Sequence, residues 1–430
     1  MKAVAGTYVH LLRRNPAFAR LYAAQLISFG GDWFATVALL GLALELTGSE
    51  ALASLILVLQ VAPFFVLSPL AGVLADRVDR RRLMIAADLG RAVVALGFLL
   101  GRDPSTLWIC FVAVALLSAG TAFFEPTASA SLPNLVEKPD LPRANVLVGS
   151  AWGTMLAVGS GIGGVVAAVL GRDAAFILNA ASFLVSGVLI LGIRRPFSQR
   201  SGSRSPGSDA AAARAPGVAA AIGEAVAVSR SSRFVAALLF SKGTFGVGVG
   251  VVLFLAVFGR EVFGAGDPGI GLLFAARGVG VVIGPFLAQS VIALDDRGLL
   301  SGIATSLVGF LVCYLLFPLA PSIWVAALLV LGAHLGGGAQ WTLSTYGLQR
   351  AVADELRGRI FSFDYALVTL TEAVSIVAAG MLAAALGPRP AIYVVLGAAA
   401  VASAGWILYT RPLRRVATTG PAEDVVAGPS

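Results

Sequence analysis

Long apolar segments alternate with short polar turns along the whole chain. A helix that crosses a bilayer needs about 20 mostly apolar residues, and each of these segments meets or approaches that length. Gly and Pro close many of them, as in the turn Gly-Arg-Asp-Pro at 101–104. The pattern therefore predicts twelve transmembrane helices, at residues 17–46, 51–75, 83–101, 105–131, 143–170, 173–193, 234–259, 268–294, 299–318, 322–347, 359–386 and 389–410.

The composition supports a membrane location. Of the 430 residues, 58% are hydrophobic and 13% are charged, and the mean hydropathy is +0.88. A soluble domain carries about 25% charged residues, so this chain has too little polar surface to face water alone and must contact membrane lipid. The net charge of +8 could suggest a nucleic-acid partner. The basic residues lie mostly in the predicted turns, however, so we expect no nucleic-acid partner.

Lys and Arg are distributed unevenly between the two sides of the predicted membrane. One side holds 24 of the 31, whereas the other holds four (Arg102, Arg172, Arg260 and Arg389). Basic residues concentrate in cytoplasmic loops, so we expect a multi-pass protein of the inner or plasma membrane of the cell with both termini cytoplasmic. The first apolar run, about 21–46, exceeds the roughly 7–15 residues of a signal-peptide core, and we expect it to remain as a helix.

The turn between the second and third segments carries a motif, G-V-L-A-D-R-V-D-R-R-R at 72–82. Small residues allow close helix approach, and an acid near a helix N-terminus is favoured, here that of the eleventh segment at 358–361. The turn resembles the motif G-x-L-a-D-r-x-G-r-r of the major facilitator superfamily of transporters, with Asp79 in place of the usual Gly. The alternative is a plain positive-inside turn. The resemblance implies a cytoplasmic gate at Gly72, Asp76, Arg77, Arg80 and Arg81.

The fifth segment is rich in small residues. It resembles the antiporter motif of the same superfamily, G-x-x-x-G-P-x-x-G-G, with Ser160 in place of Pro and the upstream Gly displaced. Small residues on one helix face let backbones approach closely, which suits a helix that rocks against a partner; packing without an antiport role is the alternative. A nucleotide-binding reading of the glycines would require a preceding strand, which an apolar span excludes. The residues of this helix-packing motif are Gly153, Gly159, Gly163 and Gly164.

Three further stretches, at 15–33, 123–136 and 348–359, resemble the enterobactin-exporter and macrolide-efflux branch of this superfamily. The resemblance implies an all-α integral membrane fold of twelve helices in two six-helix pseudo-repeat bundles, with a substrate path between the halves. Residues 196–216 are rich in Ser, Gly, Pro and Ala, as in flexible linkers. We therefore expect an N-terminal bundle at 1–193, a cytoplasmic linker with a candidate surface helix at 194–233, a C-terminal bundle at 234–415 and a disordered tail at 416–430.

Ionisable side chains inside the predicted spans invite a functional explanation, because each costs about 2.5–3.5 kcal/mol at a helix centre. Asp32, about halfway through the first segment, is the first candidate proton carrier, since a carboxylate in a low-dielectric path can exchange protons near neutral pH. A hydrogen-bonded structural acid is the alternative. Lys242 and Arg277 are placed to contact an anionic cargo or to neutralise acids. The predicted proton and substrate pathway comprises Asp32, Glu125, Lys242, Arg277 and Glu372.

Three other acids receive simpler interpretations. Asp88 and Arg91 lie three residues apart on the third segment and should pair locally. Glu45 is expected to be solvated at the external boundary. Asp364 is expected only to favour the dipole of the eleventh helix near its start.

Together these patterns predict a secondary transporter that exports a small amphipathic molecule (a drug, siderophore or secondary metabolite) by alternating access, with proton antiport. A facilitator-type importer or a lipid flippase is the alternative, and a membrane scaffold or sensor is a third class. No ATP-binding G-x-x-x-x-G-K-[ST] loop occurs. Two histidines and two separate cysteines indicate no metal site and no cofactor. We expect a monomer that is not an enzyme, with protons as the coupling ion.

Overall fold

The computed structural model describes residues 2–197, 232–293, 295–352 and 354–415, which are almost wholly helical and contain no strand. The helices lie within a few residues of the predicted segments. In the first half they are α2 (Pro16–Thr47), α3 (Glu50–Arg77), α4 (Arg80–Ala95) with η1 (Leu96–Leu100), α5 (Leu107–Leu135), η2 (Lys138–Asp140), α6 (Leu141–Val169) and α7 (Arg172–Leu191). In the second they are α10 (Arg233–Gly248), α11 (Val251–Val257) with η3 (Phe258–Val262), α12 (Gly266–Val291), α13 (Asp296–Leu316) with η4 (Phe317–Leu319), α14 (Ile323–Ala351), α15 (Asp354–Leu386) and α16 (Pro388–Arg415).

The lengths of these helices fit a bilayer. Among the described residues, eleven helical spans are long and apolar enough to cross a membrane. The remaining predicted span corresponds to α3, which has 28 residues and a described apolar stretch at Glu50–Pro63. The predicted all-α integral membrane fold is therefore confirmed. The predicted surface helix of the linker and the predicted tail lie outside the described residues.

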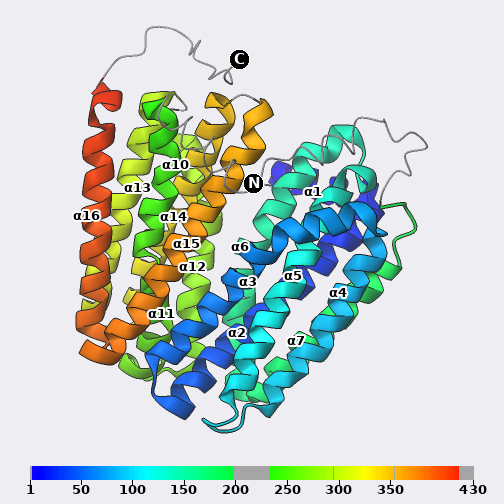
Figure 1. Ribbon diagram of the computed structural model, residues 1–430, viewed down its shortest axis with the longest axis horizontal. Helices are drawn as coiled ribbons and strands as arrows, with labels where there is room; N and C mark the ends of the chain where they lie inside the picture. Colours follow the sequence, from blue (N-terminus) through cyan, green and yellow to red (C-terminus); the bar gives the residue numbers. More distant parts are fainter. Residues whose placement is uncertain (1, 198–231, 294, 353, 416–430) are drawn as a thin grey trace.

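The helices form two groups, α2–α7 and α10–α16 (Figure 1). Each group has its own apolar core, around Phe18 and Phe124 in the first and around Leu239 and Leu299 in the second. A third cluster runs across both groups where they meet, and it includes Trp33 of α2 and Phe274 of α12. The two halves therefore share one continuous apolar contact in addition to their separate cores.

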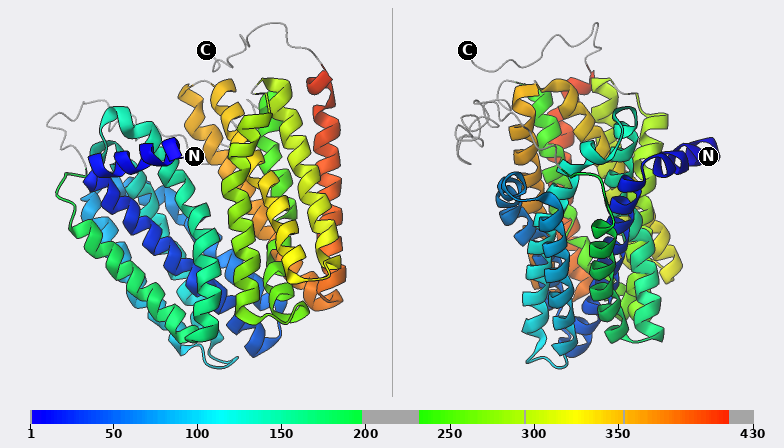
Figure 2. Two further views of the ribbon diagram at one scale, coloured as in Figure 1. Left: turned by 180° about the vertical axis from the view of Figure 1, so that it is seen from behind. Right: turned by 90° about the vertical axis from the view of Figure 1, so that its right-hand side faces the viewer.

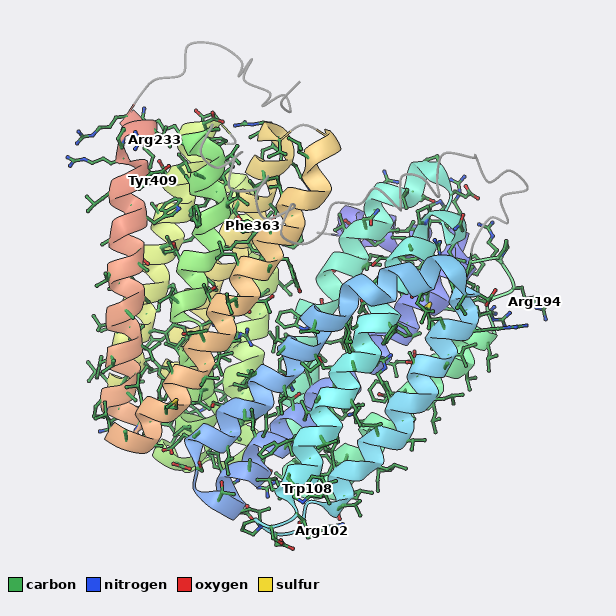
Figure 3. The ribbon with its side chains drawn as sticks, in the orientation of Figure 1. Arg102, Trp108, Arg194, Arg233, Phe363 and Tyr409 are labelled. Carbon is green, nitrogen blue, oxygen red and sulfur yellow. The ribbon has the colours of Figure 1, made fainter. Side chains whose placement is uncertain are left out.

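The two halves meet at one end and diverge toward the other (Figures 1 and 2). The divergent end carries the end of α16 and a short helix, α1 (Lys2–Arg14), which the sequence pattern did not predict. Figure 3 places Arg194 and Arg233 toward the same end and Arg102 at the opposite one. The Arg-rich turns therefore share the divergent end with the described ends of the chain.

Close backbone contact between α6 and α12 defines where the halves meet. The helices run antiparallel, because a Cβ on Gly153 would lie 3.0 Å from the Val282 side chain, whereas one on Gly164 would lie 3.1 Å from the Pro268 Cα. A Cβ on Gly149, one turn before Gly153, would have nothing within 4 Å. The tight contact between α6 and α12 therefore stops near the middle of α6.

The seventh predicted helix, 234–259, is interrupted in the structure. α10 ends at Gly248, and α11 starts at Val251 and leads into a π-helical turn, η3. At the break, the Ser375 hydroxyl of α15 donates to the Val247 carbonyl at 2.6 Å and accepts from the Gly250 N–H at 2.9 Å. A side chain from another helix thus satisfies backbone groups that the interrupted ladder leaves free.

Candidate functional site

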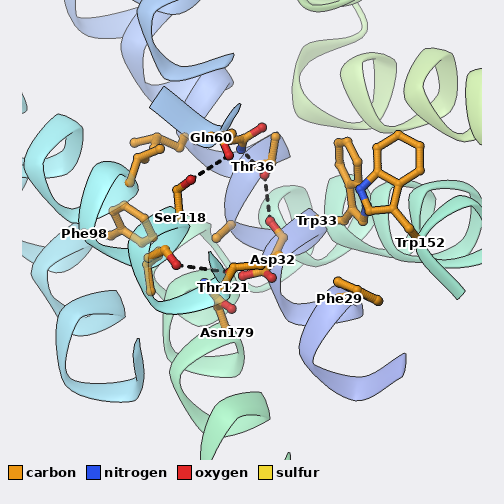
Figure 4. Close-up of a pocket in the computed structure, with 14 residues that line it drawn as sticks. Phe29, Asp32, Trp33, Thr36, Gln60, Phe98, Ser118, Thr121, Trp152 and Asn179 are labelled. Carbon is orange, nitrogen blue, oxygen red and sulfur yellow. Dashed lines mark hydrogen bonds between the residues drawn. The ribbon is translucent and has the colours of Figure 1, made fainter. Parts of the chain in front are cut away.

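A cavity of about 150 Å³ lies inside the first half, between α2, α3, η1, α5, α6 and α7. Asp32 lies at its centre, about halfway along α2 (Figure 4). Apolar and aromatic side chains form most of the wall, and a few polar groups interrupt it. The residues that matter most for its chemistry are Phe29, Asp32, Trp33, Gln60, Trp152 and Asn179.

A chain of hydrogen bonds fixes the backbone next to the Asp32 carboxylate. The Thr36 hydroxyl donates to the Asp32 backbone carbonyl at 2.7 Å, the Gln60 amide donates to the Thr36 hydroxyl at 2.7 Å, and Ser118 donates to the Gln60 carbonyl at 2.8 Å. Within the described part of the chain, no residue hydrogen-bonds or forms an ion pair with the carboxylate itself. The carboxylate is therefore available to a partner in the cavity.

Asn179 of α7 adds an unsatisfied amide to the same cavity. Its side chain is 1% exposed, and neither its Oδ1 nor its Nδ2 has a hydrogen-bond partner among the described residues. It packs against α2, because a Cβ on Gly31 would lie 2.9 Å from the Asn179 Oδ1. The sequence analysis did not select this residue, although a lone Asn within an apolar segment was the available signal.

Aromatic rings connect the cavity to the second half. The Trp33 ring centroid lies 5.9 Å from that of Trp152 on α6 and 5.8 Å from that of Phe274 on α12. The Arg277 guanidinium, also on α12, lies 5.8 Å from the Trp152 ring centroid. The Trp152 ring thus lies beside both the cavity that contains Asp32 and the Arg277 guanidinium.

The other acids of the first half have partners. Asp88 and Arg91 form the expected ion pair, both side chains are buried, and the Ser186 hydroxyl donates to Asp88 at 2.7 Å. Glu125 of α5 accepts a hydrogen bond from the Gln25 amide at 3.2 Å. Glu125 therefore belongs to the same half as Asp32 but is held by a neutral donor.

The charges of the second half lie in two places. Lys242 forms a buried ion pair with Asp364 and lies 4.7 Å from the Trp341 ring centroid. Lys242 therefore neutralises Asp364 and not one of the pathway acids Asp32, Glu125 and Glu372. The expectation that Asp364 only favours a helix dipole is wrong, because α15 begins well before it. Arg277 and Glu372 form no ion pair among the described residues.

The predicted cytoplasmic gate is described in part. Arg80 of α4 donates to the Ala130 carbonyl at 2.6 Å, and Arg81 donates to the Leu191 carbonyl. Both acceptors lie on helices of the same half, near the ends of α5 and α7. The surroundings of the remaining gate residues lie outside the described part of the structure. These residues are Gly72, Asp76 and Arg77.

The small residues of α6 face two different helices. A Cβ on Gly159 would lie 3.1 Å from the Trp33 Cβ, and one on Gly163 would lie 2.8 Å from the Phe34 Cα, both on α2. Gly153 and Gly164 face α12 instead. The motif thus has two roles in packing, one within the first half and one between the halves, rather than the single face expected.

Four charged residues join the halves at the end where they meet. Arg172 of α7 lies 2.8 Å from Glu45 of α2 and 2.7 Å from Asp267 of α12. Arg260 of η3 lies 2.5 Å from Glu45 and 2.9 Å from Asp267. Each arginine therefore binds an acid of its own half and an acid of the other. The expectation that Glu45 is merely solvated is wrong, because both arginines hold it.

The described residues contain no group of three or more His, Cys, Asp or Glu that could hold a metal ion. The fold and the cavity define a class of protein, an all-helical multi-pass membrane protein with a small cavity inside one of two packed halves. Residues 21–287 match the Major Facilitator Superfamily. The chain belongs to this superfamily, whose members are transporters and not enzymes.

Known proteins resemble the chain over different lengths. The putative bacilysin exporter BacE of Bacillus subtilis (strain 168) is 25% identical over 402 residues, which cover 92% of this chain and 94% of BacE. The uncharacterized MFS-type transporter YfiS of the same strain is 29% identical over 186 residues, and the chain matches 44% of its length. Macrolide efflux protein A of Streptococcus pyogenes is 25% identical over 184 residues, 42% of this chain and 45% of that protein.

Solved structures share the fold. The crystal structure of a bacterial homolog to the human lysosomal transporter Spinster, in an inward-facing and unoccupied conformation, superposes with a TM-score of 0.72 at 16% identity. The superposition covers 95% of this chain and 99% of that chain. This likeness shows the architecture of two helical halves and nothing about the cargo.

Proposed function

We propose that this chain exports a small amphipathic molecule (a drug, siderophore or secondary metabolite) by alternating access, in exchange for protons. The observation that carries the proposal is the cavity around Asp32, where a carboxylate in mid-span has no partner in the described chain and aromatic rings surround it. The names of BacE and macrolide efflux protein A support the outward direction.

The packing of the halves gives alternating access a physical form. The halves are in close backbone contact along α6 and α12 at one end and diverge toward the other (Figure 2). We propose that the divergent end faces the cytoplasm, because the basic turns lie there and basic residues concentrate in cytoplasmic loops. Cargo would enter from that side, and release outside would require the α6–α12 contact and the four-residue ion-pair cluster to separate.

Asp32 is the first candidate for the proton step. An ionised carboxylate in mid-span is costly unless a cation or a proton neutralises it. Cargo and proton would then neutralise the same group in alternate access states, which couples their movements. Glu125 in the same half and Glu372 in the other are the next candidates, and Lys242, which forms an ion pair with Asp364, stays a candidate of the pathway.

Gradient-driven transport in proteoliposomes tests this proposal. We expect erythromycin, chosen because a relative is named for macrolide efflux, to move against its gradient when a pH gradient is imposed and not when an uncoupler is present. Asp32→Asn should abolish this movement, because it fixes the neutral form. Asp103→Asn is the control, because it removes an exposed acid far from the cavity. A hydrogen bond from Ser105 lowers the pKa of the Asp103 carboxyl, so this acid is not expected to exchange protons near neutral pH. Full transport by Asp32→Asn would remove this residue from the coupling step.

The proposed orientation has its own test. A cysteine at Ser203, in the linker, and one at Ser105, in the turn before α5, can be labelled in intact cells with a membrane-impermeant reagent. Only the second should react if both termini and the linker are cytoplasmic. Reaction at Ser203 in sealed cells would reverse the orientation.

The alternatives differ in direction and not in fold. An importer would accumulate the probe in intact cells, whereas an exporter would lower its cellular level. A lipid flippase would move a fluorescent phospholipid between leaflets of the proteoliposome. A scaffold would do none of these, and buried charges of both signs argue against it because an inert bundle gains little from retaining them. We propose that the working unit is a monomer.

A further inference from the structure

The cavity of the first half contains an acidic side chain without an ion-pair partner. Asp32 has no ion pair in the described chain. Arg91 contacts the wall, where it donates to Thr121 at 3.3 Å, but Asp88 already holds it in a buried ion pair. Arg277 of α12 lies outside the wall, 5.8 Å from the Trp152 ring centroid. The Arg91–Asp88 ion pair therefore lies behind the cavity wall, and no described residue forms an ion pair with the Asp32 carboxylate.

A second and independent observation is the Asn179 amide. A buried amide with neither its oxygen nor its nitrogen bonded costs free energy, and such groups are rare in folded proteins unless a ligand or water satisfies them. This amide lies in the same cavity as Asp32 (Figure 4). The cavity thus offers an acceptor carboxylate, an acceptor carbonyl oxygen and a donor N–H₂ that no described residue uses.

The remaining wall favours a cation with an apolar body. Phe29, Trp33 and Trp152 line the cavity together with aliphatic side chains. Aromatic faces attract cations within about 6 Å, most strongly where water is excluded. Trp33 is 7% exposed and Trp152 is 42% exposed, so the wall is less enclosed at Trp152 than at Trp33.

Building on the proposed export function, we propose that this cavity is the subsite for the protonated-amine head group of an amphipathic cargo. The ammonium donates to the Asp32 carboxylate and to the Asn179 Oδ1, and the Asn179 Nδ2 donates to a neighbouring carbonyl or hydroxyl of the cargo. The cavity of about 150 Å³ has room for about five water-sized groups of about 30 Å³ each. It therefore holds the head of the cargo, and the apolar body extends past Trp152 toward α12.

Three fluorescent probes with the same reporter group test the charge of the head. Dansylcadaverine carries a primary amine, its N-acetyl derivative is neutral, and dansyl-aminocaproate is an anion. Their binding to the purified full-length protein in detergent can be followed by energy transfer from tryptophan. We expect dansylcadaverine to bind at least tenfold more tightly than either analogue.

Variants assign the preference to named groups. Asp32→Asn should weaken dansylcadaverine binding by about tenfold or more and leave the neutral analogue unchanged, because only the charge is removed. Asn179→Leu, which keeps the branch at Cγ and removes both polar atoms, should weaken binding of the amine by a smaller factor. Asp103→Asn in the distant turn should bind all three probes as the unaltered protein does. A melting curve for each variant separates loss of binding from loss of fold.

The outcomes separate this inference from the proposed function. Equal affinity for the amine and its N-acetyl derivative, tighter binding of the anion, or unchanged amine binding by Asp32→Asn would overturn the subsite. If erythromycin export is still driven by the pH gradient, the proposed function stands without it. If the amine binds through Asp32 but no gradient drives transport, the subsite stands and proton-coupled export fails.

Discussion

Adding one methyl group to α6 should shift the balance between the two access states. A Cβ on Gly164 would lie 2.7 Å from the Asp267 carbonyl oxygen, 3.1 Å from the Pro268 Cα and 3.2 Å from the Gly271 Cα. All three atoms are backbone atoms of α12, so no side-chain rotation relieves the overlap. Gly161 lies on the same helix, and a Cβ there would meet only the Ala275 Cβ at an ordinary 3.5 Å.

The magnitude follows from the cost of overpacking. Extra methyl groups in a close-packed contact cost about 1–3 kcal/mol. Because each 1.4 kcal/mol changes an equilibrium tenfold, Gly164→Ala should shift the protein about 5- to 150-fold away from the state in which α6 and α12 touch. Gly161→Ala should leave the equilibrium unchanged and so controls for the change in helix propensity.

Accessibility of a buried cysteine measures this equilibrium. Ser54 of α3 is 3% exposed, and it lies against α15 at the closed end, where a Cβ on Gly380 would meet its hydroxyl. In a background without Cys110 and Cys313, a cysteine at Ser54 should react faster with an impermeant reagent in Gly164→Ala. Equal labelling rates for the Gly161 and Gly164 variants, either both unchanged or both raised, would refute the role of the α6–α12 contact.

Two further predictions concern charged groups. Asp267→Asn, which weakens the hold of two arginines across the halves, should speed labelling at the closed end about tenfold, whereas Asp173→Asn in an exposed pair within one half should not change it. Arg91→Leu leaves Asp88 buried without a cation and should lower the free energy of unfolding by about 3–5 kcal/mol. Adding Asp88→Asn to this variant should restore much of the melting temperature. No recovery would contradict the argument from the buried charge.

The helices were predictable because their signal is local. Length and apolar composition alone place a segment in a bilayer, and the twelve predicted ranges fall on the observed helices. The Asp88–Arg91 pair was predictable for the same reason, since three residues along a helix set the distance between the side chains. The interruption after Gly248 was not, because it depends on a hydroxyl from α15.

The polar partners were not predictable, because they come from distant parts of the chain. Lys242 and Asp364 are 122 residues apart in sequence, and Glu45 and Arg260 are 215 residues apart. Nothing near Glu45 distinguishes an acid solvated at a boundary from one held by arginines of two halves. The two faces of the α6 glycines were hidden for a related reason, since spacing identifies a small-residue stripe but not which neighbour packs against it.

α6 connects the two parts of the molecule that transport would have to coordinate. Trp152 lines the cavity beside Asp32, and the next residue, Gly153, starts the contact with α12. A cargo seated against the Trp152 ring would therefore contact the same helix that holds the halves together. Interfaces packed backbone to backbone exchange between discrete arrangements instead of deforming gradually. If the amine head binds as proposed, the amine should change the labelling rate of a cysteine at Ser54. This change should disappear when Trp152 is replaced by alanine, even though Asp32 and the α6–α12 glycines remain.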